Sequence, residues 1–128
     1  MVKKIIKHSG SFPISNAVLQ SDIYLMEISG QIGVDTKTGD LVEGIEAQTA
    51  KTLDNIKNIL EQVGWSLSNI IKTRVYLSDM ENYSKMNKVY GEYFKSDYPA
   101  RVAMAVKELP KSALVEIEAT ASSDKIKS

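Results

Sequence analysis

The stretch Pro99-Ala100-Arg101-Val102-Ala103-Met104-Ala105-Val106, with Glu116-Ile117-Glu118 further along, sets one cation and two carboxylates among apolar residues. Alternation along the first stretch places Arg101 and Ala103 on one face and Val102 and Met104 on the other, as in a β-strand. A guanidinium in a half-buried strand is unfavourable unless an anion meets it. Either the protein or a ligand must supply that anion.

The second stretch reads as another strand, with Glu116 and Glu118 on one face and Ile117 on the opposite face. The turn-forming residues 109–112 lie between the two stretches, which predicts neighbouring strands in a hairpin. A cross-strand ion pair of Arg101 with a glutamate would then stabilise the sheet by about 0.2–1 kcal/mol. The alternative is an anion-binding pocket, because Ala103 beside the arginine fills little volume.

The composition limits the classes of function that the protein can have. The chain has 128 residues, 43% hydrophobic and 25% charged, which predicts a single domain over residues 1–128. Lys+Arg and Asp+Glu are 16 each, so no basic excess points to a nucleic-acid partner. Cysteine is absent and His8 is the only histidine, which excludes thiol and serine–histidine catalysis and histidine metal clusters. We expect no cofactor, no metal, no membrane segment and a cytoplasmic protein.

Hydrophobic patterning predicts an α+β domain. Strands are expected around Ile5-Ile6, in residues 17–34 with a hairpin break at Ser21-Asp22, and at 70–77, 99–106 and 114–120. Helices are expected over 45–63 and from a capping box at Ser78 to about Phe94, followed by a polar tail over 121–128. The order implies a mixed β-sheet with two helices packed on one face. Strands 70–77 and 99–106 are apolar on both faces, which indicates that other subunits cover the second face.

Two further residues stand out as candidates. Gly30 interrupts an apolar strand, which marks either a β-bulge or a backbone N–H that faces a ligand oxygen. Asn87 lies beside the apolar stripe of the second helix, where it is either a structural amide or part of a site. Together with Arg101 and the two glutamates, these groups could bind a small carboxylate and position a water molecule. They could not perform redox or phosphoryl-transfer chemistry.

These residues resemble the reactive intermediate deaminases, the Rid or YjgF-like family, over about residues 5–120. The resemblance is carried by Ser29-Gly30-Gln31-Ile32, Thr36-Lys37-Thr38-Gly39, Gln48-Thr49, Leu53-Asp54-Asn55-Ile56, Ile71-Lys72-Thr73, Met86-Asn87 with Tyr90, and Pro99-Ala100-Arg101 through Glu116-Ile117-Glu118. It implies a YjgF-like, chorismate-mutase-like architecture: a homotrimer with a central barrel, outer helices and ligand clefts between subunits. It also implies hydrolysis of reactive 2-enamine and 2-imine acids, such as 2-aminoacrylate, to a 2-keto acid and ammonia.

The resemblance also implies roles for individual residues. Arg101 matches the arginine that grips the substrate carboxylate, and Glu116 matches the glutamate that orients the attacking water. Gly30 offers a backbone N–H, while Ser29 and Asn87 match positions that line the cleft.

Two departures from the family pattern concern the site. Many members have a Gly-Pro-Tyr segment where this chain has Ile14-Ser15-Asn16-Ala17-Val18, so the aromatic wall of the cleft is missing or supplied elsewhere. The changed segment, Ser15, Asn16 and Ala17, bears on the substrate range and on whether activity is retained. Ala103 replaces a cysteine that many members carry, which matters less if water is the nucleophile.

Two other functions compete with the deaminase. One is a non-catalytic trimer that binds small carboxylates or keto acids and regulates a partner. The other is a ribonuclease, which the zero net charge and the absence of a usable histidine disfavour.

Overall fold

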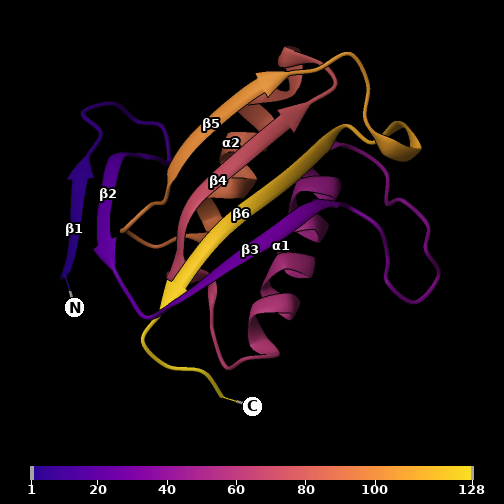
Figure 1. The fold of residues 1–128 in the computed structure, drawn as a ribbon. Helices are drawn as coiled ribbons and strands as arrows, with labels where there is room; N and C mark the ends of the chain where they lie inside the picture. Colours follow the sequence, from indigo (N-terminus) through magenta and orange to yellow (C-terminus); the bar gives the residue numbers. More distant parts are fainter. Residues whose placement is uncertain (1, 128) are drawn as a thin grey trace.

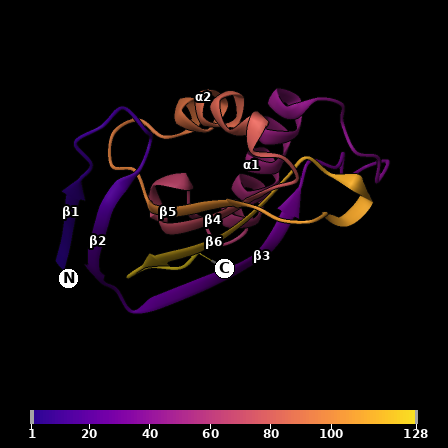
Figure 2. The same ribbon diagram turned by 90° about the horizontal axis from the view of Figure 1, so that it is seen from above.

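The structure, a computed structural model, describes residues 2–127, which form a six-stranded mixed sheet with two helices on one face (Figures 1 and 2). The elements in chain order are β1 Val2–Lys7, β2 Ser15–Ser21, β3 Tyr24–Ile32, α1 Ile45–Glu61, β4 Ile70–Leu77, α2 Tyr83–Tyr93, β5 Ala100–Ala105 and β6 Val115–Ser123. Short 3-10 turns at 67–69, 80–82 and 110–112 connect them. The predicted α+β class, with both helices on one side of the sheet, is confirmed.

The strand order β1-β2-β5-β4-β6-β3 corrects one predicted hairpin. β4 lies between β5 and β6, parallel to β5 and antiparallel to β6. The Arg101 and Glu116 strands are therefore not neighbours, although the turn between them exists. The predicted hairpin is wrong because the connection carries the chain across the end of β4, where Ser78 N donates to Leu114 O at 3.2 Å.

The break at Ser21-Asp22 does not form a hairpin either. β2 pairs with β1 and β3 pairs with β6, near opposite ends of the sheet. The Ser122 hydroxyl donates to the Asp22 carboxylate at 2.7 Å, and Ile23 N donates to Asp124 Oδ1 at 2.9 Å. These bonds fix the connection to the end of β6, so the chain crosses from one side of the sheet to the other instead of folding back.

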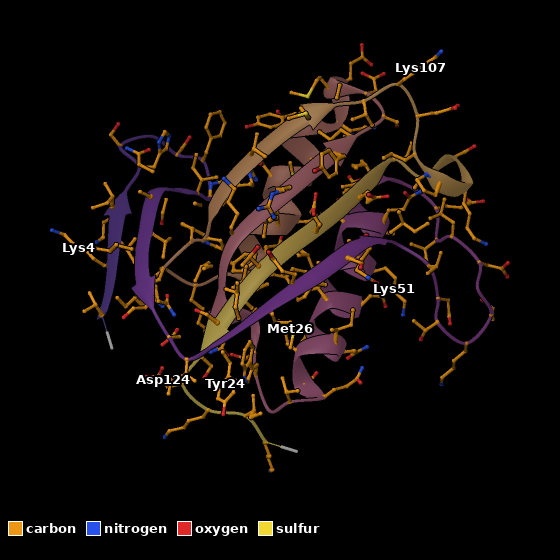
Figure 3. The ribbon with its side chains drawn as sticks, viewed as in Figure 1. Lys4, Tyr24, Met26, Lys51, Lys107 and Asp124 are labelled. Atoms are coloured by element: carbon orange, nitrogen blue, oxygen red, sulfur yellow. The ribbon has the colours of Figure 1, made fainter. Side chains whose placement is uncertain are left out.

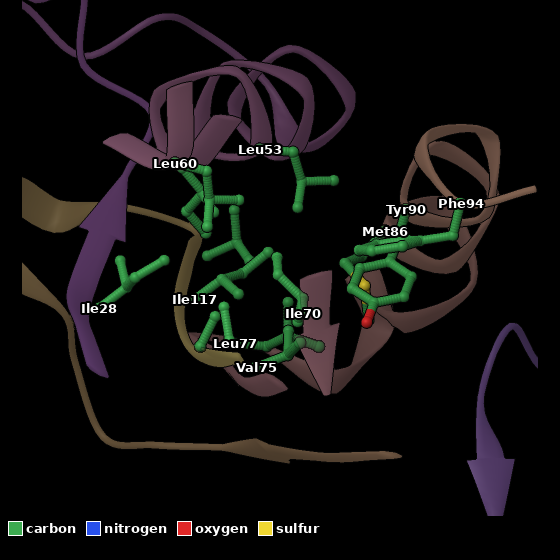
Figure 4. Packing of buried hydrophobic residues seen from close by; sticks show 14 of the residues in the cluster. Ile28, Leu53, Leu60, Ile70, Val75, Leu77, Met86, Tyr90, Phe94 and Ile117 are labelled. Atoms are coloured by element: carbon green, nitrogen blue, oxygen red, sulfur yellow. The ribbon is translucent and has the colours of Figure 1, made fainter. Parts of the chain in front are cut away.

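The core lies between the helices and the inner face of the sheet (Figure 4). The predicted stripe of α1 is confirmed: Leu53, Ile56 and Leu60 are fully buried against Val75 and Ile117 of the central strands. Fully buried apolar side chains of this size contribute on the order of 1.5–3 kcal/mol each. This packing anchors the helix-facing side chains of β4 and β6 in the core.

The ends of two predicted elements differ in the structure. α2 starts at Tyr83 after a short turn, and Asp79 caps that turn by accepting from Glu81 N at 2.9 Å, in place of the predicted Ser78. β6 continues through Ser123, with Ala121 and Ser122 buried, so the polar tail does not begin at residue 121. Pairing with the start of β3 extends the strand. Residue 128 lies outside the described residues.

The face of the sheet that the helices leave open carries both polar and apolar side chains, and it is the face toward the viewer in Figure 3. Half-buried Arg74 and Tyr76 stand on it from β4. Val102 and Met104 are 36% and 44% exposed there. Within residues 2–127, no helix has the length and apolar character needed to cross a membrane.

Candidate functional site

The Arg101 guanidinium rests against the inner face of α2. Its Cζ atom lies 4.9 Å from the centre of the Tyr90 ring, so the cation stacks on the aromatic face. One terminal nitrogen donates to the Tyr83 hydroxyl at 3.2 Å, and the other points to the Met86 sulfur at 3.9 Å. None of these partners carries a negative charge. The half-buried cation is therefore held in place without being neutralised, which leaves it available to an anion.

A hydrogen bond to the sheet fixes the position of Tyr90. Its hydroxyl shares a 2.7 Å hydrogen bond with the hydroxyl of Thr73, and both side chains are fully buried. Burial raises the pKa of Tyr90 to about 12, so the ring stays neutral under Arg101. Thr73 pairs with Arg101 in the parallel pairing of β4 with β5. The hydroxyl that bonds Tyr90 and the arginine that stacks on Tyr90 therefore come from adjacent positions in the sheet.

The two predicted catalytic groups lie on opposite faces of the sheet. Arg101 shares the helix-facing side with its ladder partner Thr73. Glu116 pairs with Tyr76, whose side chain stands on the open face, while the next residue, Ile117, is buried in the core. The cross-strand ion pair between Arg101 and a glutamate is therefore wrong. A single chain does not bring Arg101 and Glu116 together.

Asn87 lies with the Arg101 group on α2. It follows Tyr83 by one helical turn and precedes Tyr90 by three residues, so the three side chains share a face of the helix. The Oδ1 atom of Asn87 is buried and has no hydrogen-bond partner within residues 2–127. Buried amide oxygens are rarely left unpaired, so this acceptor sets Asn87 apart from the other residues on its face of α2.

Ser29, Gly30 and Glu116 form the second group, on the open face. The register of β3 against β6 shifts between Ile28 and Gln31, so of the two alternatives for Gly30 the structure shows the β-bulge. A Cβ atom built on Gly30 would lie 2.5 Å from Glu116 Oε2. Only glycine therefore leaves room for the Glu116 carboxylate in its present position. Ser29 and Gly30 are exposed, and Glu116 is half-buried.

Glu118, the other glutamate of the motif, already accepts a hydrogen bond from a neighbouring strand. The Tyr76 hydroxyl donates to Glu118 Oε1 at 2.5 Å, and this bond, with burial, raises the pKa of Tyr76. Next to it, the Thr120 hydroxyl donates to Glu27 at 2.5 Å. Glu118 is thus tied into the sheet, whereas Glu116 is the carboxylate beside the bulge.

The loop before β2, next to the changed segment, brings the Phe12 side chain to the Arg101 group. Ser15 is buried and bonded to the backbone of Tyr98, so Ser15 has a structural position, while Asn16 and Ala17 are exposed. The Phe12 ring, 46% exposed, meets the Tyr83 ring edge-on with centroids 5.7 Å apart. Phe12 and Tyr83 therefore place two aromatic rings beside Arg101.

The apolar stripe predicted for the second helix includes Tyr83, Met86 and Tyr90, and in the structure all three also contact Arg101, which the sequence did not predict. The helical spacing of these residues around Asn87 was the available signal, but only the packing of α2 on β5 shows that they surround a guanidinium. Within residues 2–127, no group of three or more His, Cys, Asp or Glu side chains is arranged to hold a metal ion.

The chain is similar to known proteins over most of its length. Residues 13–123 match the family described as endoribonuclease L-PSP. The chain is 51% identical over 110 residues to a RutC family protein of Pyrococcus horikoshii, covering 85% of this chain and 86% of that protein. It is 46% identical over 111 residues to human 2-iminobutanoate/2-iminopropanoate deaminase, covering 85% and 79%. The crystal structure of E. coli TdcF with bound serine superposes with a TM-score of 0.74 at 32% identity, covering 94% and 98%.

Proposed function

This chain belongs to the endoribonuclease L-PSP family, the YjgF/Rid family, and from that membership we propose that it is a hydrolytic deaminase of 2-imino acids. The observation that carries the proposal is the half-buried Arg101 guanidinium, whose hydrogen-bond and cation–π partners within residues 2–127, Tyr83, Met86 and Tyr90, are all neutral. Such a cation suits a small carboxylate, because the planar fork donates two parallel hydrogen bonds. The human relative is named for imines of this kind, and the E. coli relative holds serine, which also carries a carboxylate.

The proposed assembly is a homotrimer with a central barrel, in which each cleft lies between two subunits. Arg101 lies on the helix side of the sheet with Asn87 of α2, and Glu116 lies on the other side, so under this proposal a second copy completes the site. The exposed Val102 and Met104 on the open face support a contact of that face with another subunit. In this arrangement one subunit binds the carboxylate, and its neighbour supplies the water-orienting glutamate.

The reaction requires only addition of water and loss of ammonia. The protonated imine R–C(=NH2+)–COO− takes up H2O and gives R–CO–COO− and NH4+, so atoms and charge balance. Its carbon is already electrophilic, and orientation of the water by Glu116 would contribute about 10²–10⁴-fold. Under this proposal, Asn87 and the Ser29-Gly30 bulge line the cleft, and the bulge lies next to the Glu116 carboxylate that orients the water.

This chemistry relies on the side chains described and needs no metal or cofactor. The family description also names an endoribonuclease. The zero formal net charge and the neutral aromatic surroundings of Arg101 favour a small anionic substrate over RNA.

A competition assay tests the proposal. A threonine dehydratase generates 2-iminobutanoate in the presence of semicarbazide, which traps the imine, and release of 2-oxobutanoate is followed. We expect the wild-type protein to accelerate release, Arg101→Ala and Glu116→Ala to abolish the acceleration, and the control Glu92→Ala, an exposed carboxylate of α2, to retain it. If Glu116→Ala binds 2-oxobutanoate normally and wild type fails to accelerate release, the chain is a binding protein and the deaminase proposal is wrong.

A further inference from the structure

The Tyr83 hydroxyl holds the guanidinium of Arg101 in a defined orientation. A guanidinium has five N–H donors, two on each terminal nitrogen and one on Nε. Tyr83 accepts from one terminal nitrogen at 3.2 Å, and the Met86 sulfur faces the other at 3.9 Å. Within residues 2–127, each terminal nitrogen therefore keeps one N–H without a hydrogen-bond partner. A carboxylate can engage two guanidinium donors as a fork.

The Tyr90 ring fixes the guanidinium from a different direction. The cation lies over the ring with Cζ 4.9 Å from its centre, but a flat ring does not by itself fix the rotation of the guanidinium over it. The hydrogen bond to Tyr83 removes this rotation, because it fixes the direction of one N–H bond. Orientation of the fork thus depends mainly on the Tyr83 hydroxyl at 3.2 Å, with a longer contact from the Met86 sulfur at 3.9 Å.

Tyr83 is in turn held by the loop before β2. The Phe12 ring meets it edge-on, with the ring planes at 77° and the centroids 5.7 Å apart. Such aromatic pairs contribute beyond the area they bury. Within residues 2–127, Arg101 is the hydrogen-bond partner of the Tyr83 hydroxyl, so the position of that hydroxyl serves Arg101 and no other described group.

We propose that Tyr83 is a positioning residue for substrate binding, which orients the Arg101 fork toward the carboxylate of a 2-imino or 2-keto acid. This inference rests on the proposed deaminase function and adds to it the group that makes the arginine selective for a planar carboxylate. An arginine held in this way loses less freedom when the substrate binds, so the gain is in affinity and not in the chemical step.

The test is Tyr83→Phe, which removes the hydroxyl and keeps the ring against Phe12. Loss of one hydrogen bond to a charged group weakens binding by about tenfold. We expect the KM for 2-iminobutanoate and the dissociation constant of 2-oxobutanoate to rise by that factor, while kcat stays within about twofold. Tyr24→Phe, an exposed tyrosine on β3, is the matched control and should leave both constants unchanged. Melting temperatures show whether each variant is folded.

A double-mutant cycle separates the effect on Arg101 from a general one. In an Arg101→Lys background there is no fork to orient, so Tyr83→Phe should have no further effect on the binding of 2-oxobutanoate. The inference is overturned if Tyr83→Phe binds like wild type, or if its effect persists fully in the Arg101→Lys background. Wild-type turnover with an unchanged Tyr83→Phe variant overturns this inference alone. Absence of wild-type turnover overturns the proposed function.

Discussion

The contact between Gly30 and Glu116 makes one substitution especially informative. In Gly30→Ala the new methyl group would lie 2.5 Å from Glu116 Oε2 and 2.9 Å from its Cδ atom. Ordinary contacts of a Cβ atom begin near 3.4 Å, so the carboxylate must move by about 1 Å, a displacement that can reduce catalysis by about 10²-fold. The carboxylate is the free end of a flexible side chain, so it can move without unfolding the strand.

The stability of Gly30→Ala is expected to stay close to that of wild type. Gly30 is not among the residues with positive φ, so its backbone accepts alanine. Removing glycine from an unstrained position stabilises a protein by about 0.4–1 kcal/mol through the unfolded state, which offsets the small rearrangement of Glu116. We therefore expect a roughly 10²-fold fall in kcat with an almost unchanged melting temperature.

Gly33→Ala is the contrasting variant, which should affect stability, and Gly91→Ala is the control variant, which should have no effect. A Cβ atom at Gly33 would lie 2.8 Å from both Cα and O of Gln48, which are backbone atoms of α1 and cannot yield. Gly33→Ala should therefore destabilise the fold by about 1–3 kcal/mol. Gly91→Ala, inside α2 with its nearest neighbour at 3.4 Å, should leave activity intact. The variants are compared by imine turnover and by urea denaturation. Full activity in folded Gly30→Ala would refute the assignment of Glu116 in its present position as the water-orienting group.

Two further predictions concern stability. Burial raises the pKa of Tyr90 to about 12 from 10.0, so its stabilising contribution is complete below pH 10 and declines as the pH rises toward 12, by up to about 1.4 kcal/mol per pH unit. Melting temperatures measured between about pH 9 and 11.5 should fall less steeply for Tyr90→Phe than for wild type, and equal slopes would contradict this assignment. Trp65 Nε1 donates to Lys125 O at 2.7 Å, so Trp65→Phe should lose about 1–2 kcal/mol in urea unfolding. A loss that persists after residues 124–128 are deleted would show that the bond to the C-terminal segment is not its cause.

Local patterns predicted the elements better than their arrangement. The alternation of residues 70–77 and the stripe of α1 identified both elements, because each depends on a period within one segment. Strand order depends on contacts between distant segments. The insertion of β4 between β5 and β6 therefore could not be read from the turn at residues 109–112.

In the candidate site, too, local features could be predicted from the sequence, whereas contacts between distant segments could not. The bulge at Gly30 could be predicted, because a glycine inside a strand usually marks a bulge or a close approach to the backbone. The carboxylate of Glu116 beneath that bulge could not, since it comes from a strand more than eighty residues away in the chain. The partners of Arg101 were likewise hidden, because apolar spacing on α2 is the same whether its tyrosines face a core residue or a guanidinium.

Subunit mixing tests the central claim most directly, namely that a site combines Arg101 of one subunit with Glu116 of another. Arg101→Ala and Glu116→Ala are each inactive under the proposal and are unfolded and refolded together in equal amounts. In a symmetric trimer of randomly mixed subunits, about one quarter of the clefts would receive a native residue at both positions. Recovery of about that fraction of wild-type turnover is the predicted result. No recovery in mixed trimers shown to contain both variants would contradict the shared site.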